Sequence, residues 1–319
     1  MSNLAISKDG IFALEIMSQT LRPLKPFSDI CQALVRFLIH LRLKFVAILV
    51  PIFLWGAFIS EEPLHASFWS GFILFHLCLY GGVNALNSYY DRDEGPIGGL
   101  KQPPKVDGSL FYLAWGIQIL GFVFAFALPI GFRLIYLTAM GMSLAYSHPA
   151  IRLKGSPIGS VLIVAIGQGW LTYWAGWIAN RGDALSIFAG RGTLGGLAIT
   201  IITVGFYPLT QIYQTEGDCT KGDLTLAVWL GVRKSFQFAL VCVALAGVCM
   251  FLLFWFYFRP LEAIVLSGYF IGLWRFIYKW GHNYHPTDQM GNYHIVMRLS
   301  LANSGSFTVY LALHFLHVL

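Results

Sequence analysis

Apolar runs long enough to cross a lipid bilayer fill most of this 319-residue chain. A membrane-spanning helix needs about 20 consecutive, mostly apolar residues. Only 11% of the residues are charged, whereas an average soluble domain has roughly 25%. We therefore predict an integral membrane protein with nine transmembrane helices, over residues 37–59, 67–90, 109–129, 132–148, 157–179, 194–214, 235–258, 261–280 and 297–319.

We expect the first 36 residues to form a leader and residues 37–319 to form a single membrane domain. The leader lacks the uninterrupted apolar core of a signal peptide, and its acids Asp9 and Glu15 argue against a transit peptide. Residues Ile11 to Leu21 carry apolar side chains at roughly helical spacing. This pattern is compatible with an amphipathic helix on the membrane surface and also with a solvated leader.

The basic residues are distributed unevenly between the two sides of the predicted spans. If the N-terminus lies inside, the outer side holds Arg133, Arg181, Arg191 and Arg259, and all other Lys and Arg fall on the inner side. Such an excess is typical of cytoplasmic loops. We therefore expect the N-terminus and the loops of the site to be cytoplasmic, and the net charge of +6 requires no nucleic-acid partner.

An oxygen-rich stretch interrupts the apolar sequence at the inner end of the second span. Asp93 points away from the other polar residues of this stretch if the helix continues through it. At about 100° per residue, one helical face carries Asn84, Asn87, Asp91 and Glu94.

A second oxygen-rich stretch follows the sixth span, where Gln211, Gln214 and Asp218 share a face. Mg²⁺ prefers oxygen ligands, and where protein carboxylates are few it completes its coordination with water and substrate phosphates. The two stretches therefore predict a site for a metal-bound diphosphate. Asn87 and Asp91 are spaced as Gln214 and Asp218 are, which suggests a repeat. We expect an all-α fold of two pseudo-repeated four-helix units plus a ninth helix around a central cavity.

Three segments resemble motifs of the UbiA superfamily of intramembrane prenyltransferases. NSYYDRDEGPIGGLKQPP (residues 87–104) resembles the first acidic motif of that family, and YQTEGDCTKGDLTLAVWLG (213–231) resembles the second. YSHPAIRLK (146–154) is similar to the segment after the fourth helix. The resemblance implies a membrane enzyme that uses Mg²⁺ to transfer an isoprenyl group from an allylic isoprenyl diphosphate to an aromatic or other lipophilic acceptor.

The resemblance also assigns candidate roles to individual residues. The catalytic candidates are Asn87, Asp91 and Asp218, and the metal ligands are Asn87, Asp91, Glu94, Gln214 and Asp218. The diphosphate-binding candidates are Lys101, Lys154, Tyr146 and Ser147, with Arg92, Lys221 and Arg42 as weaker ones.

The chain departs from the family pattern at three positions. Ser88, Gly95 and Gln214 stand where carboxylates are expected. The loss of these carboxylates predicts weaker metal affinity or one tightly held ion in place of the usual two.

Aromatic residues near the predicted site are candidates for the prenyl pocket, because a ring face attracts a carbocation. Tyr207 shares a helical face with Gln211 and Gln214. Trp174 lies in the fifth span with Trp170 and Trp177, and these three fit an interfacial belt equally well.

Two other functions fit the same pattern. A terpene cyclase of the same superfamily would use the diphosphate without an acceptor. A secondary transporter would also carry intramembrane acids, but near the bilayer midplane and on interrupted helices. The acids in this chain lie at the inner ends of the spans, which disfavours a transporter.

Overall fold

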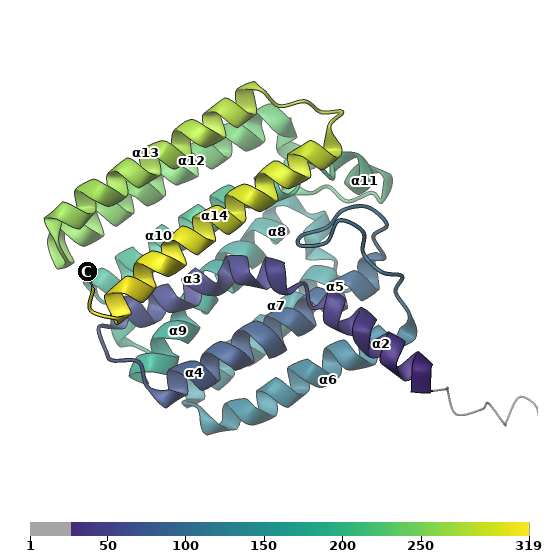
Figure 1. The fold of residues 1–319 in the computed structure, drawn as a ribbon, viewed down its shortest axis with the longest axis horizontal. Helices are drawn as coiled ribbons and strands as arrows, with labels where there is room; N and C mark the ends of the chain where they lie inside the picture. The colour runs from purple at the N-terminus through teal and green to yellow at the C-terminus, as the bar shows by residue number, and fades with distance from the viewer. Residues whose placement is uncertain (1–26, 319) are drawn as a thin grey trace, which may run out of the picture.

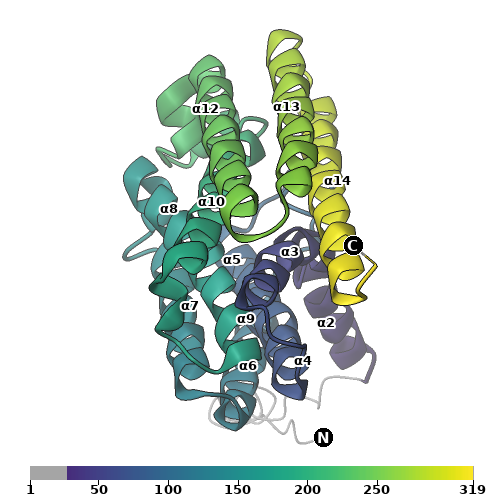
Figure 2. The same ribbon diagram turned by 90° about the vertical axis from the view of Figure 1, so that its left-hand side faces the viewer.

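The computed structural model describes residues 27–318, which form helices joined by short loops and contain no β-strand beyond one isolated bridge. In chain order the α-helices are α2 (Phe27–His40), α3 (Leu43–Ser60), α4 (Ala66–Ile73), α5 (Gly81–Asp91), α6 (Gly108–Phe124), α7 (Ile130–Ser147), α8 (Pro157–Ile163), α9 (Thr172–Arg181), α10 (Gly190–Phe206), α11 (Thr215–Thr220), α12 (Leu226–Tyr257), α13 (Pro260–His282) and α14 (Gln289–Phe315). Figures 1 and 2 show the longer helices packed side by side in one bundle. The all-α prediction is confirmed.

A helix lies at each of the nine predicted spans, and seven helical segments of the described chain are long and apolar enough to cross a membrane. The other two predicted spans correspond to α7 and α14. Polar residues such as Arg298 and Asn303 lower the hydropathy of α14. The count of nine crossings and the internal repeat remain predictions.

The first predicted span began too early. Residues 37–40 belong to α2, and the chain turns at Arg42, whose φ of 51° lies in the left-handed region. The first long apolar helix therefore begins at Leu43. The predicted surface helix at Ile11 to Leu21 lies outside the described residues.

The helix α12 begins at Leu226, before the predicted boundary at residue 235. The side chain of Thr225 accepts a hydrogen bond from the backbone N–H of Val228 and so caps the helix N-terminus. The backbone kinks at Gly231, where φ is 71°. The pair Arg233 and Lys234 interrupts the apolar run within this helix, which is why hydropathy alone set the boundary too late.

Two spans contain a π-helical turn. Residues Leu74–Tyr80 join α4 to α5, and Val164–Leu171 join α8 to α9, so each span is continuous. The Tyr80 hydroxyl is hydrogen-bonded to Thr172, which connects the two spans. Such turns widen a helix and are frequent at functional sites; here they bring Tyr80 and Gln168 to the wall of the cavity described below.

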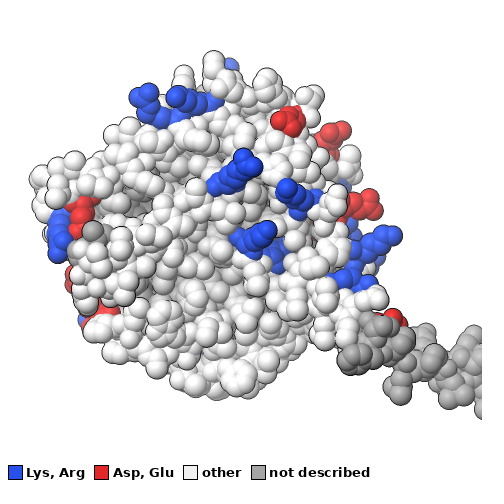
Figure 3. Space-filling view, viewed as in Figure 1, with Lys and Arg blue, Asp and Glu red and all other residues white. Residues whose placement is uncertain are grey.

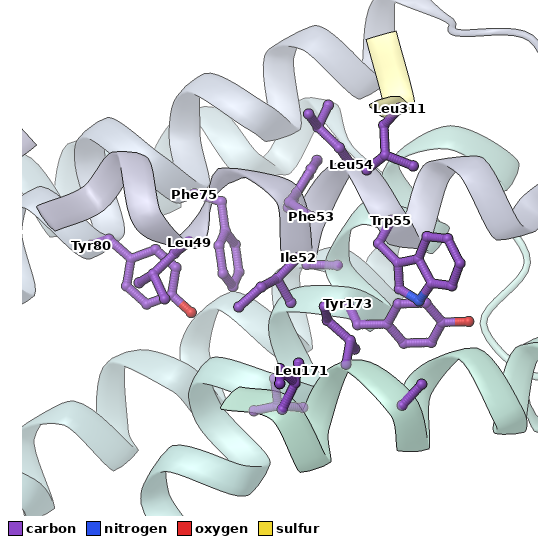
Figure 4. Close-up of a cluster of buried hydrophobic side chains, with 14 of the residues drawn as sticks. Leu49, Ile52, Phe53, Leu54, Trp55, Phe75, Tyr80, Leu171, Tyr173 and Leu311 are labelled. Atoms are coloured by element: carbon purple, nitrogen blue, oxygen red, sulfur yellow. The ribbon is translucent and has the colours of Figure 1, made fainter. Parts of the chain in front are cut away.

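Part of the hydrophobic core lies at the contact between α3 and α9, where side chains such as Phe53 and Tyr173 are buried (Figure 4). A Cβ at Gly176 would overlap the carbonyl of Phe53, and a Cβ at Gly56 would overlap the carbonyl of Tyr173. These glycines allow the two helices to approach closely, as small residues do between membrane helices. The Trp55 indole donates to the Gly195 carbonyl at 3.0 Å and ties α3 to α10.

Charge is confined to parts of the surface. In Figure 3 the lower part of the visible face is almost free of charged side chains, whereas charges lie along the top, over the right-hand half and in a small group at the left edge. Figure 1 places α2, α5 and α11 at the right-hand side. The acidic stretches at the ends of α5 and in α11 therefore lie at the same end of the bundle.

Candidate active site

A cavity of about 310 Å³ opens between the helices and joins two chemically different regions. Its polar region contains residues from the end of α5, from the loop after α7 and from α11. Its apolar region extends between α3, α10, α12 and α14, with Ile52, Ile199, Met250 and Phe307 among its lining residues. The central cavity expected from the sequence is present.

Asp91 ends α5 and lies in the polar region with its side chain only 5% exposed. Its carboxylate forms an ion pair with Lys154 and lies 3.7 Å from Arg152. The Asn87 amide, one helical turn earlier, donates to Asp91 at 2.8 Å and to the Ser147 hydroxyl at 3.2 Å. The structure therefore brings together Asn87, Asp91, Ser147 and Lys154, as the sequence predicted.

Arg42 is a central cation of this region, although the sequence pointed to it only weakly. Its guanidinium is buried and donates to the amide oxygens of Asn84 and Asn87, each at 3.1 Å. Burial lowers the pKa of this guanidinium, and the nearby Asp91 and Asp93 oppose that effect. In the sequence, Arg42 is recognisable only as a basic residue directly before an apolar span. The excess of basic residues on the cytoplasmic side of membrane proteins also explains such a residue, so its position did not assign it to the site.

The second motif forms a short turn and the helix α11. Asp218 accepts a hydrogen bond from the Thr225 hydroxyl at 3.1 Å. Burial raises the pKa of Asp218 to about 6. The Gln214 amide donates to the Pro96 carbonyl at 2.6 Å, so the second motif is tied directly to the part of the first motif that follows α5.

The pair Arg152 and Asp223 joins the loop after α7 to the second motif. Its two hydrogen bonds, at 2.7 and 2.8 Å, use both carboxylate oxygens, and this bidentate geometry is the strong form of such a pair. The hydrogen bond to Asp223 raises the pKa of the Arg152 guanidinium. The backbone N–H of Leu224 also donates to the Gly155 carbonyl at 3.1 Å. Lys154, which lies between Arg152 and Gly155, is thereby held beside Asp91.

Lys221 bridges the two acidic motifs. Its ammonium group pairs with Asp93 and lies 3.4 Å from the Asp91 carbonyl. Burial opposes the charge on Lys221, but the hydrogen bond with Asp93 and the negative charges of Asp93, Asp91 and Asp218 together outweigh it and raise the pKa of Lys221.

The predicted helical face fails after Asp91. The helix ends there because Arg92 adopts a left-handed conformation, with φ of 48°. Glu94 is consequently exposed and does not line the cavity, whereas Asp93, expected to point away, lines it. Asp223 lines the cavity as well.

Two of the predicted diphosphate-binding bases lie outside the cavity. Lys101 is exposed and does not line it. Arg92 is also exposed, and its guanidinium lies over the Tyr89 ring at 5.9 Å. Both belong to the loop region after α5, where helical spacing no longer predicts the direction in which a side chain points.

Of the three predicted pocket residues, two line the cavity and one does not. Tyr207 and Gln211 line the cavity, and the Tyr207 hydroxyl lies 3.1 Å from that of Tyr146. Trp174 does not line it; its indole donates to the Ala184 carbonyl at 2.8 Å in the loop after α9. The structure therefore places Trp174 outside the cavity, and its place in an interfacial belt stays a prediction.

The donor set fits a divalent cation only when a substrate supplies further oxygens. The described residues contain no group of three or more His, Cys, Asp or Glu side chains able to hold a metal. Asp91, Asp93 and Asp223 already face cationic side chains, whereas Asp218 is hydrogen-bonded to a neutral hydroxyl. Asp91 and Asp218 line the same cavity, so a hard cation held there would complete its coordination with phosphate oxygens and water.

These features define an integral membrane protein whose cavity can hold an amphiphilic substrate with an anionic head. A model of the UbiA prenyltransferase family matches residues 49–301, and the chain belongs to that family.

A digeranylgeranylglyceryl phosphate synthase from Methanothrix thermoacetophila is 26% identical over 182 residues, covering 55% of this chain and 64% of that protein. The match thus spans less than two thirds of the relative. A UbiA homolog from Archaeoglobus fulgidus, in a structure bound to GPP and Mg²⁺, is 20% identical with a TM-score of 0.63, covering 85% of this chain and 99% of that one. A UbiA homolog from Aeropyrum pernix K1 is 18% identical with a TM-score of 0.58, covering 83% and 97%. The two structures share the fold of this chain.

Proposed function

We propose that the protein transfers an isoprenyl group from an allylic isoprenyl diphosphate to a lipophilic acceptor drawn from the membrane, with Mg²⁺ as cofactor. One observation carries this proposal: a single cavity joins a charged region, which suits a diphosphate, to an apolar region, which suits a prenyl chain. The fold neighbour bound to GPP and Mg²⁺ supports the substrate class.

The bases of the charged region act on the leaving group. Cleavage of the allylic C–O bond leaves a carbocation and a diphosphate anion, so charge develops where cations must already be fixed. Lys154 and Arg42 line the cavity, and the hydroxyls of Tyr146 and Ser147 are available there as hydrogen-bond donors. Mg²⁺ held by Asp91 and Asp218 would add charge stabilisation on the leaving oxygens.

The apolar region protects the carbocation. Side chains such as Leu49, Ile52 and Ile199 line it; they cannot act as nucleophiles, and they keep water from the cation. The acceptor nucleophile then attacks the allylic carbon and loses a proton. A lipophilic acceptor matches a cavity surrounded by lipid-facing helices.

The charged region faces the cytoplasm in this proposal. Lys154 and Lys221 lie at the end of the bundle where the chain carries its excess of basic residues. That excess is the usual signature of the cytoplasmic side.

The proposal is tested by expressing the protein and identifying accumulated prenylated lipids by mass spectrometry. Asp91→Asn and Lys154→Met are expected to abolish the product, because each removes a charge from the cavity. Lys101→Met is the matched control, since Lys101 is exposed outside the cavity, and it is expected to retain the product.

Product formation that survives loss of both Asp91 and Asp218 would overturn the assignment. A hydrocarbon or terpene alcohol formed from farnesyl or geranylgeranyl diphosphate alone, and dependent on Asp91, would show a terpene cyclase instead. Transport of the diphosphate across vesicles without cleavage would show a transporter.

A further inference from the structure

We propose that the site takes a single divalent cation with the diphosphate, and that Lys221 stands where a second cation would be needed. This inference rests on the proposed function and specifies its metal requirement. It follows from how the carboxylates of the cavity are already paired.

Most of the cavity carboxylates have a side-chain cation of their own. Asp91 faces Lys154, and Asp93 faces Lys221. Asp223 accepts both hydrogen bonds of the Arg152 guanidinium. A divalent ion at any of these three would have to compete with a positive charge that belongs to the protein.

Asp218 is the exception among these carboxylates. Its hydrogen bond comes from the neutral Thr225 hydroxyl, and it lines the cavity that Asp91 also lines. Within residues 27–318, one oxygen of Asp91 accepts from Asn87, and Lys154 contacts the other. Asp218 therefore offers one position for a cation at which no ion-pair partner has to be displaced.

Lys221 performs a task that a bridging metal ion could perform. It contacts the Asp93 carboxylate and the backbone carbonyl of Asp91, and so fastens the second motif to the first. Gln214 adds a second fastening through its amide donation to Pro96. An aspartate at position 214 has no hydrogen to donate when ionised, so the amide makes a contact that the expected carboxylate would not.

The charges at the site also balance. Four carboxylates (Asp91, Asp93, Asp218 and Asp223) lie among four cations (Arg42, Arg152, Lys154 and Lys221). An incoming diphosphate adds negative charge, which one accompanying divalent ion and these bases can offset. A second ion would find its remaining ligand, Asp93, occupied by Lys221.

The test counts Mn²⁺ ions bound to the purified full-length protein by electron paramagnetic resonance. Mn²⁺ is titrated in the presence of farnesyl thiodiphosphate, an analogue that ionises far more slowly than the diphosphate. Wild type is expected to bind one Mn²⁺ per chain, with no coupling between spins. Lys221→Ala frees Asp93, and this variant is expected to bind a second Mn²⁺ close enough for the two spins to couple.

Further variants keep the result interpretable. Lys221→Arg preserves the pair with Asp93 and is expected to bind one Mn²⁺, as is the surface control Lys101→Ala. The double variant Lys221→Ala/Asp93→Asn lacks the freed ligand and is also expected to bind one. Lys221→Met removes the same charge but keeps most of the side chain, and it gives a second reading if Lys221→Ala does not fold. Two coupled Mn²⁺ ions in wild type, or one ion in folded Lys221→Ala, would overturn the inference and leave the proposed function standing. Failure of wild type to bind the analogue would overturn the proposed function too.

Discussion

The ion pair between Arg152 and Asp223 permits a quantitative prediction. Asp223→Ala removes two charge-assisted hydrogen bonds of 2.7 and 2.8 Å. A fully buried pair costs about 3–5 kcal/mol when one partner is lost. The Asp223 side chain is 6% exposed, but that of Arg152 is 26% exposed, so water can partly solvate the released guanidinium. We expect Asp223→Ala to lower the free energy of unfolding by about 2–3 kcal/mol.

A double-mutant cycle isolates the pair from other effects of each substitution. Unfolding is followed in mixed micelles with increasing dodecyl sulfate for wild type, Asp223→Ala, Arg152→Met and the double variant. The coupling energy is expected to be about 1.5–2 kcal/mol, because the residues share one bidentate contact. The control cycle uses Arg36 and Asp107, which are 37% and 42% exposed; it is expected to give less than about 1 kcal/mol. Equal coupling energies in the two cycles would refute the reasoning.

Three further outcomes are expected. Gly176→Ala should lower the free energy of unfolding by about 1–3 kcal/mol, because its Cβ overlaps the Phe53 carbonyl, whereas Gly116→Ala, with open space around its Cβ, should not destabilise in the same titration. Asp218→Asn should stabilise the metal-free protein at pH 7.5, because burial raises the pKa of Asp218 to about 6 and folding then favours the protonated acid. The stability difference between the variant and wild type should disappear as the pH falls through about 6 toward 4; a difference in melting temperature that does not change with pH would contradict this. Arg42→Met should weaken farnesyl thiodiphosphate binding about tenfold or more, measured calorimetrically, since a hydrogen bond to a charged group contributes about 1.5–3 kcal/mol; unchanged affinity would exclude Arg42 from the site.

The all-α fold could be predicted from the sequence. In a bilayer no water can hydrogen-bond to the backbone, so each apolar run satisfies its own N–H and C=O groups by forming a helix. The convergence of Asp91 and Asp218 on one cavity also followed, because alternate helix ends meet at the same side of a bundle. Boundaries were less predictable. A capping residue such as Thr225 starts a helix inside sequence that hydropathy assigns to a loop.

The helical face on which a side chain lies could be predicted only as far as the helix continued. Beyond Asp91 the left-handed Arg92 redirects the chain, and Asp93 and Glu94 exchange their expected positions. The ion pair between Arg152 and Asp223 could not be predicted either, because the two residues are far apart in sequence and are brought together only by tertiary packing.

Release of diphosphate by the purified protein tests the central claim most directly. Farnesyl or geranylgeranyl diphosphate is supplied with Mg²⁺ and membrane lipid extract, and inorganic diphosphate is measured over time. Wild type and Lys101→Met should release it, whereas Asp91→Asn and Asp218→Asn should release almost none. Undiminished release by folded Asp91→Asn and Asp218→Asn would contradict the claim that these two carboxylates act on one shared diphosphate.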